Sequence, residues 1–231
     1  MIKPFRSTLG ALALAATALG AHAGGVSGPI GVQVTLTGWT YGVGNNVQAT
    51  NYSGAAGGFK GALAGTDGFD SISFQTYCIE LEEHFGFSPT AMTNYILVDG
   101  ASYFARRRND VGIAERLGQL MTFVADHPSQ VDSAVESSAM QLAIWNLVYD
   151  RDFSVTTLSS FNDASALRGQ ANTLLAGAAS TASRYSVFAL EKVGSQDFIV
   201  FGANTVPEPG SLALAALALG GLAVAGRRTR A

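Results

Sequence analysis

The sequence is poor in cysteine, in charge and in basic residues. Among its 231 residues there is one cysteine, Cys78, and only 14 residues are lysine or arginine; charged residues make up 13% of the chain. A single cysteine cannot form the intrachain disulfides that exported proteins normally use, so Cys78 is either a small buried hydrophobic residue or a reactive group. Nucleic-acid binding needs a basic face, and this composition argues against it.

The N-terminus has the three parts of a cleavable leader. A basic start precedes an apolar run from Leu9 to Leu19, and the small residues Ala21 and Ala23 follow. This order of charged, apolar and small-x-small segments is typical of a secretory signal peptide. We therefore predict a signal peptide over residues 1–23, cleaved after Ala23, with the Sec translocon and signal peptidase as partners.

The C-terminus combines a rigid motif, an apolar segment and a basic end. Pro207, Glu208 and Pro209 precede residues 211–226, which are almost wholly apolar, and the arginine-rich stretch 227–230 follows. A helix over 211–226 covers about 24 Å, a little less than the hydrocarbon core of a bilayer. Basic residues stay on the cytoplasmic side, so the segment predicts a weak transmembrane helix with the rest of the chain outside.

This order of Pro-Glu-Pro, short apolar helix and arginines, over residues 206–231, resembles the PEP-CTERM sorting signal. The resemblance implies an exosortase as the processing partner, with cleavage near Pro207, Glu208 and Pro209. It also implies a Gram-negative bacterium that makes extracellular polysaccharide or a biofilm matrix. We expect the protein to be anchored transiently in the inner membrane, and then to reach the cell surface or the extracellular matrix.

The body between these ends, residues 24–205, reads as one β-rich domain of the α+β class. It carries nine basic and sixteen acidic residues, a balance that anionic lipids and phosphate backbones repel. Alternating and helical patterns place strands at both ends of the body and a helical insert between them, with the end strands sharing one sheet. The stretch at 42–68 predicts loops, with a weak hairpin as the alternative. The predicted strands are 32–41, 71–81, 185–192 and 197–202, and the predicted helices lie at about 110–150 and 164–179.

One buried helix carries an unexpected amide. The second half of the region at 110–150 starts, on its pattern, at Ser129 as N-cap with Asp132 three residues later. From Ala139 to Tyr149 the helix is apolar nearly all round, which predicts burial. Gln141 lies within this stretch, and a buried primary amide needs several hydrogen-bond partners or it destabilises the fold by about 1–3 kcal/mol.

Cys78 and Gln141 lie in two short motifs, at 76–80 (Thr-Tyr-Cys-Ile-Glu) and at 140–145 (Met-Gln-Leu-Ala-Ile-Trp). Together they resemble the Cys-Gln thioester domains, of TQXA type, of bacterial surface adhesins, except that a threonine usually stands where this chain has Met140. The resemblance implies a thioester-domain-like fold with Cys78 as the sulfur and Gln141 as the acyl donor, shielded by Tyr77 and Trp145. The targets would be surface amines or hydroxyls, including those of extracellular polysaccharide.

Two other functions stay open. The body is alternatively a non-covalent extracellular matrix or carbohydrate-binding module, in which Cys78 and Gln141 only pack in the core. A cysteine hydrolase would pair Cys78 with His84 or His127, but no orienting Asn or Asp occurs at a recognisable position. We therefore expect a binding or adhesion protein and no enzyme.

The charged segments near Cys78 and before the first helix have ordinary explanations. Glu80, Glu82, Glu83 and His84 contain groups that bind metals, but their spacing matches no standard site and predicts a solvated strand end. The arginine triplet 106–108 is able to grip an anionic polysaccharide, although a solvated loop is the simpler interpretation. We expect no metal and no cofactor.

Overall fold

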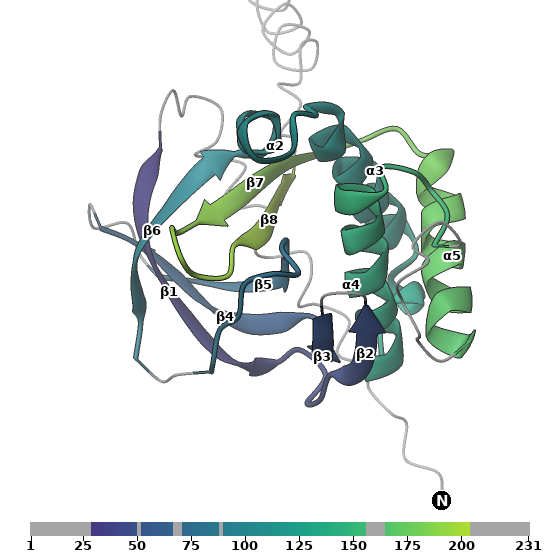
Figure 1. The fold of residues 1–231 in the computed structure, drawn as a ribbon, viewed down its shortest axis with the longest axis horizontal. Helices are drawn as coiled ribbons and strands as arrows, with labels where there is room; N and C mark the ends of the chain where they lie inside the picture. The colour runs from purple at the N-terminus through teal and green to yellow at the C-terminus, as the bar shows by residue number, and fades with distance from the viewer. Residues whose placement is uncertain (1–28, 50–51, 67–70, 88–89, 156–164, 204–231) are drawn as a thin grey trace, which may run out of the picture.

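The middle of the chain forms a closed β-barrel with a layer of helices packed against one side (Figure 1). The predicted signal peptide and its cleavage site, the sorting motif and the helix predicted at 211–226 lie outside the part of the chain that the structure describes. The structure is a computed structural model that describes residues 29–49, 52–66, 71–87, 90–155 and 165–203.

All six barrel strands are paired antiparallel. Around the barrel they are β1 (Ile30–Trp39), β4 (Phe59–Gly65), β5 (Ile72–Cys78), β8 (Phe198–Ala203), β7 (Tyr185–Glu191) and β6 (Met92–Asp99), which closes on β1. Closure leaves no unpaired edge strand in the barrel. Strands from both ends of the body share the sheet, as predicted, although β1 and β8 are not neighbours.

The alternating pattern of β1 sets which residues face the barrel interior. Val32, Val34 and Leu36 are at most 1% exposed, whereas Gln33 between them is exposed. Successive side chains of a strand point to opposite faces, so this alternation buries one face of β1. The neighbouring β4 approaches closely at Gly61, where a β-carbon would lie 1.8 Å from the carbonyl oxygen of Thr35.

The region predicted as loops with a weak hairpin, residues 42–68, holds three strands in its described part. β2 (Asn45–Ala49) and β3 (Tyr52–Ala56) form a separate two-stranded hairpin, and β4 follows within the barrel. The prediction of loops was wrong for β4, because its Gly- and Ala-rich sequence has weak strand propensity. The barrel neighbours β1 and β5 hold β4 in place through both of its edges.

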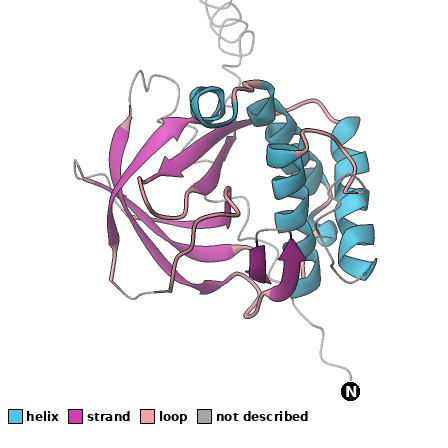
Figure 2. Cartoon of the chain, viewed as in Figure 1, coloured by secondary structure: helices cyan, strands magenta, loops and turns pink. Residues whose placement is uncertain are grey.

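Among the described residues, four α-helices lie between β6 and β7 in the sequence; α3, α4 and α5 gather on one side of the barrel, and α2 lies above β7 (Figure 2). The helices at 112–126 and 165–179 confirm the predicted helical regions. Within this layer α4 packs against α5 and the β2–β3 hairpin, and α3 packs against β7. The helices are α2 (Gly100–Arg108), α3 (Gly112–Asp126), α4 (Ala134–Tyr149) and α5 (Ser165–Ala179), with a 3₁₀ turn at Pro128–Gln130.

Two helix starts differ from the predictions. The N-cap of α4 is Ser133 rather than Ser129, since the Ser133 hydroxyl accepts from the backbone N–H of Glu136 and the Glu136 carboxylate accepts from Ser133. Ser133 and Glu136 stand at the spacing of a capping box, and the 3₁₀ turn Pro128–Gln130 precedes this helix start. The arginine triplet is also not a loop, because residues 106–108 form the last turn of α2, which ends at Asn109 in a left-handed conformation.

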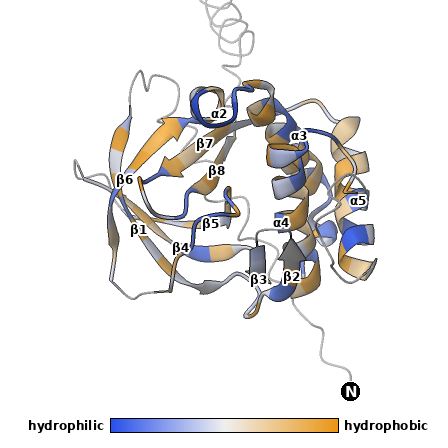
Figure 3. Ribbon diagram, viewed as in Figure 1, coloured by the Kyte–Doolittle hydropathy of each residue, from blue (hydrophilic) through white to orange (hydrophobic). Residues whose placement is uncertain are grey.

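Among the described residues, one hydrophobic cluster runs from the barrel interior into the helical layer. The strands β6, β7 and β8 carry much of this apolar surface (Figure 3), and α4 is buried from Ser137 through Val148. The predicted burial of α4 is therefore confirmed, and the fold is α+β and β-rich, as expected. Among the described residues, no helix combines the length and the hydropathy needed to cross a membrane.

Candidate functional site

Cys78 and Gln141 meet where the barrel contacts the helical layer. Cys78 is the last residue of β5 and Gln141 lies in the middle of α4, and these side chains are 8% and 0% exposed. The backbone N–H of Cys78 donates to Oε1 of Gln141 at 2.9 Å, and Nε2 of Gln141 donates to the carbonyl oxygen of Cys78 at 2.8 Å. One side-chain amide thus satisfies both backbone groups of one residue.

The strand order explains why this backbone is free to bind Gln141. β4 pairs with β5 only as far as Thr76, whereas β8 pairs with Tyr77 and Cys78 on the other edge. Beyond Thr76, α4 lies beside β5 and the amide of Gln141 replaces the missing strand partner. Buried backbone groups are nearly always paired. Without Gln141, the N–H and carbonyl of Cys78 would be buried without partners, at a cost in stability, because β4 does not extend to Cys78.

Aromatic side chains enclose this junction. Tyr77 and Trp145, the residues predicted to shield it, are 9% and 1% exposed. The ring of Tyr52, from the β2–β3 hairpin, lies 5.0 Å from the ring of Trp145 at a steep angle. Burial is the main cause that raises the pKa of Tyr52 to about 12, with an effect of Cys78 as the second cause. No motif in the sequence pointed to Tyr52, which the β2–β3 hairpin brings to this junction.

The thiol of Cys78 is neutral in this environment. Burial raises its pKa, and the nearby charge of Glu80 raises it further. A thiolate is the reactive form of cysteine, so the resting side chain is not poised as a free nucleophile. This argues against the hydrolase, which would need a persistent thiolate or an adjacent base.

The two histidines proposed for the hydrolase occupy other surroundings. His84 is exposed, and its ring lies 6.3 Å from that of Tyr52. His127, at the end of α3, stacks on Phe123 at 4.5 Å between ring centroids, and its Nδ1 lies 2.9 Å from the Phe123 carbonyl oxygen. Among the described residues, neither histidine makes a hydrogen bond to Cys78.

The segment after Cys78 is tied to the helices by Tyr149. Its hydroxyl accepts from the backbone N–H of Leu81 at 2.8 Å and from the guanidinium of Arg108 at 2.7 Å, and it donates to Glu82. The guanidinium of Arg108 also lies over the Tyr149 ring. Tyr149 therefore fixes the end of α4, the end of α2 and the loop after β5 to one another.

The other two arginines of the triplet bind a carboxylate of β7. Both Arg106 and Arg107 donate to Glu191, at 2.8 Å and 3.2 Å in their ion pairs. These bonds, with that from Arg106 as the largest cause, lower the pKa of Glu191. The triplet is thus engaged within the protein, which leaves it poorly suited to grip an anionic polysaccharide.

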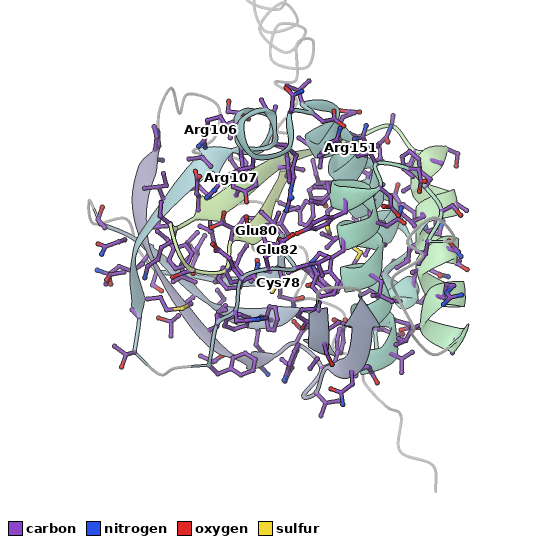
Figure 4. The ribbon with its side chains drawn as sticks, viewed as in Figure 1. Cys78, Glu80, Glu82, Arg106, Arg107 and Arg151 are labelled. Carbon is purple, nitrogen blue, oxygen red and sulfur yellow. The ribbon has the colours of Figure 1, made fainter. Side chains whose placement is uncertain are left out.

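The acidic residues after Cys78 divide into two groups. Glu82 and His84 are exposed, as expected of a solvated strand end, but Glu80 and Glu83 are only partly exposed. Together with Asp197, which is fully buried before β8, Glu80 and Glu83 place three carboxylate oxygens within 4.8 Å of one another. Figure 4 shows Cys78 and Glu80 between the barrel and the helices, with Arg106 and Arg107 on the side of α2. Sequence reasoning did not include Asp197, which lies far along the chain.

Comparison with known proteins identifies one segment. Residues 205–230 match the model of the PEP-CTERM protein-sorting motif. No curated protein and no solved structure matches the chain. This segment includes the predicted Pro207, Glu208 and Pro209, so the sequence-based assignment of the sorting motif is confirmed. The chain therefore carries a PEP-CTERM sorting motif, which marks it as an exported protein that an exosortase processes.

Proposed function

We propose that the exported body is a cell-surface adhesion module that stores an internal thioester between Cys78 and Gln141. One observation carries this proposal: the amide of Gln141 is held against the backbone of Cys78 by two hydrogen bonds in a buried, aromatic-lined junction. The pairing fixes the acyl group beside the residue whose sulfur would attack it. Such positioning is a large part of what an intramolecular reaction requires.

The chemistry needs no cofactor and balances within the pair. The sulfur of Cys78 attacks Cδ of Gln141, a C–S bond forms, the C–N bond breaks, and the amide nitrogen leaves as ammonia with the thiol proton. An amine from outside then attacks the same carbon, which forms an amide and returns the thiol to Cys78. A hydroxyl would give an ester by the same route.

The surroundings suit this reaction in two ways. The N–H of Cys78 donates to Oε1 of Gln141, the oxygen on which negative charge develops during attack, so it would act as an oxyanion donor. Burial of Tyr77 and Trp145 excludes the water that would hydrolyse a thioester. Because burial also raises the pKa of the thiol, its proton would leave in the same step as the sulfur attacks.

A non-covalent matrix or carbohydrate-binding module is the second candidate. The same hydrogen bonds favour it, because the Gln141 amide pairs both backbone groups of Cys78 and so has a structural role without any reaction. Met140, in place of the threonine of the adhesin pattern, favours it as well. In this candidate no bond forms, and polysaccharide is bound at the surface of the body.

For either candidate we propose the same route and destination. The Sec translocon and signal peptidase export the chain, the C-terminal helix anchors it transiently in the inner membrane, and the exosortase then processes it. The body would reach the cell surface or the biofilm matrix of a Gram-negative bacterium, where surface amines or extracellular polysaccharide are its partners. Its role would be adhesion rather than enzymatic turnover.

Intact mass of the protein purified from its native cells tests the thioester. A formed thioester predicts a mass lower by one ammonia, and a gain of one methylamine upon treatment. The Cys78→Ala variant is the matched control, and it should have full mass and take up no methylamine while remaining folded. A wild-type protein of full mass with a titratable thiol would reject the thioester and leave the non-covalent module.

A further inference from the structure

Two carboxylate oxygens close to Cys78 are buried without any hydrogen-bond donor. They are Oε2 of Glu80 and Oε2 of Glu83, both in the segment that follows β5. Burying an ionised carboxylate is costly unless a positive charge or hydrogen bonds compensate for the lost water. The fold itself therefore leaves these two oxygens without the partner that they require.

The neighbouring positive charges are committed elsewhere. Arg106 and Arg107 both bind Glu191, and Nη2 of Arg107 lies 3.7 Å from Oδ2 of Asp197. The four carboxylates of this cluster, which are Glu80, Glu83, Glu191 and Asp197, thus face two guanidinium groups. Among the described residues, neither guanidinium forms an ion pair with Glu80 or Glu83, the two residues with the unpartnered oxygens.

An oxygen of Glu80 and an oxygen of Glu83 lie within 4.8 Å of each other. Two carboxylates that close cannot both stay ionised unless something positive lies between them. Either a proton shared by the two carboxylates or a bound cation would relieve this repulsion. Asp197 faces the same space, with its oxygens oriented by the Tyr103 hydroxyl at 2.7 Å and the Lys192 N–H at 2.8 Å. A third carboxylate adds charge that one proton shared by Glu80 and Glu83 does not offset, which favours a cation.

We propose that Glu80, Glu83 and Asp197 bind a divalent cation, and that this cation is Ca²⁺. All three ligands are carboxylate oxygens, which are preferred by hard cations rather than by zinc. The three oxygens lie within 4.8 Å of one another. Ca²⁺ bonds oxygen at about 2.3–2.6 Å, so oxygens on opposite sides of one ion stand up to about 5 Å apart, as this cluster allows.

The place of the cluster gives the cation a role. Glu80 and Glu83 belong to the loop that begins directly after Cys78, and Asp197 precedes β8, the strand that pairs with Cys78. A bound Ca²⁺ would fasten this loop to the β7–β8 connection and hold the end of β5 in place. The inference does not rest on the thioester, because the ligands include neither Cys78 nor Gln141.

Terbium luminescence and thermal unfolding of the full chain in detergent test the proposal. Tb³⁺ occupies Ca²⁺ sites, and the phenol of Tyr103 beside Asp197 should sensitise its emission. We expect Ca²⁺ to displace Tb³⁺, and to raise the Tm relative to EDTA, with a Kd at or below about 1 mM, as for extracellular calcium modules. A wild-type protein that shows no Ca²⁺ effect up to about 10 mM would overturn the site.

The loop supplies a matched pair of variants. Glu83→Gln should weaken Ca²⁺ binding at least tenfold, whereas Glu82→Gln, an exposed carboxylate that bonds to Tyr149, should bind as the wild type does. Equal binding by both variants would contradict the proposal. Should Glu83→Gln fail to fold, lowering the pH to 5 in the wild type serves instead, because protons then compete for the same oxygens. Cys78→Ala should keep the Ca²⁺ affinity whether or not a thioester forms.

Discussion

Two buried polar sites lie two residues apart around the end of β5, and the fold treats them in opposite ways. At Cys78, the amide of Gln141 satisfies both backbone groups with hydrogen bonds below 3 Å. At Glu80 and Glu83, one carboxylate oxygen of each residue is buried and has no donor. The first site is complete with the atoms of the chain alone, whereas the second requires a component from outside.

The difference follows from charge. A neutral amide carries both a donor and an acceptor, so a protein backbone is able to pair it fully. An ionised carboxylate only accepts, and several carboxylates together accumulate charge that hydrogen bonds do not remove. The fully hydrogen-bonded amide of Gln141 therefore indicates a structural role or a reaction with Cys78. The buried carboxylates of Glu80 and Glu83, which lack donors, indicate a bound ligand.

The largest expected effect comes from breaking the complete site. Gln141→Leu keeps the helix but leaves the N–H and the carbonyl of Cys78 buried without partners. Each orphaned group costs about 1–3 kcal/mol, so we expect a loss of about 3 kcal/mol in the free energy of unfolding, measured by urea denaturation. Gln170→Leu on α5 is the control and should cost less, because Gln170 is only partly buried and its bonds to Gln130 are longer, at 3.1 and 3.2 Å. A loss below about 1 kcal/mol for Gln141→Leu would mean that the pairing contributes no more than one ordinary hydrogen bond.

Filling the incomplete site should have the next largest effect. Ca²⁺ at a hundred times its Kd should stabilise the protein by about 2.7 kcal/mol, since it binds only the folded state. Urea denaturation with Ca²⁺ and with EDTA measures the difference, and Mg²⁺ at the same concentration is the control for ionic strength. Stability that is the same in Ca²⁺ and EDTA would remove the contrast between the two sites.

The pH dependence sharpens the same contrast. Burial, then the charges of Asp197 and Glu83, raises the pKa of Glu80 from 4.5 to about 7, against an opposing effect of Arg107; burial raises that of Asp197 from 3.8 to about 6. Tyr103 faces both carboxylates. Between these values the folded state holds protons that the unfolded chain has lost. The contribution of these groups to stability is therefore fully present below about pH 4.5, and it is lost as the pH rises through 7.

The measurement for this prediction is urea denaturation in EDTA at several pH values between 5 and 8. Stability should decline across this range, and Glu83→Gln should flatten the decline because one like charge is gone. Ca²⁺ should also flatten it, since the ion replaces the protons. A stability that rises steadily with pH in EDTA would show that these carboxylates are ionised and paired in the folded protein.

A smaller effect is expected where the two sites are joined to the helices. Tyr149→Phe removes the hydroxyl that accepts from Leu81 and Arg108 and donates to Glu82. The buried N–H of Leu81 loses its partner, so we expect a cost of about 1 kcal/mol by urea denaturation, with slight loosening of the loop that holds Glu83. An unchanged midpoint would mean that water replaces the hydroxyl.

The smallest effect belongs to Glu82→Gln. The side chain of Glu82 is 54% exposed, and its ion pair with Arg108 spans 3.7 Å. Exposed ion pairs contribute roughly 0–1 kcal/mol, so stability should shift by less than about 0.5 kcal/mol. Glu82 stands between Glu80 and Glu83 in the sequence. A large loss of stability in Glu82→Gln would therefore mean that burial does not determine which of these carboxylates contributes to stability.

Much of the fold was predictable where the sequence pattern is strong. The alternation of β1, the turn between β7 and β8, and the apolar positions of α3 and α5 all correspond to observed elements. β4 was missed because its glycines and alanines carry little propensity. α2 was missed because its three arginines suggested solvent, although Glu191 from a later strand binds two of them.

The candidate sites show the same division. Cys78 and Gln141 were identified from two short motifs, and the structure brings them into direct hydrogen-bond contact. Whether they react, and whether Tyr77 and Trp145 shield them for that reason, stays a prediction. Asp197 and Tyr52 were not predictable, because barrel closure and the β2–β3 hairpin bring them to the site, and neither arrangement has a local signature.

The position of β8 has a mechanical consequence. β8 ends at Ala203, two residues before the sorting motif begins, and lies between β5 and β7 in the closed barrel. If exosortase processing leaves the protein tethered through this end, any pull on the tether loads β8 along its length. The ladders on both sides of β8 would then bear that force in shear, and the strand that holds Cys78 is one of the two that resist it.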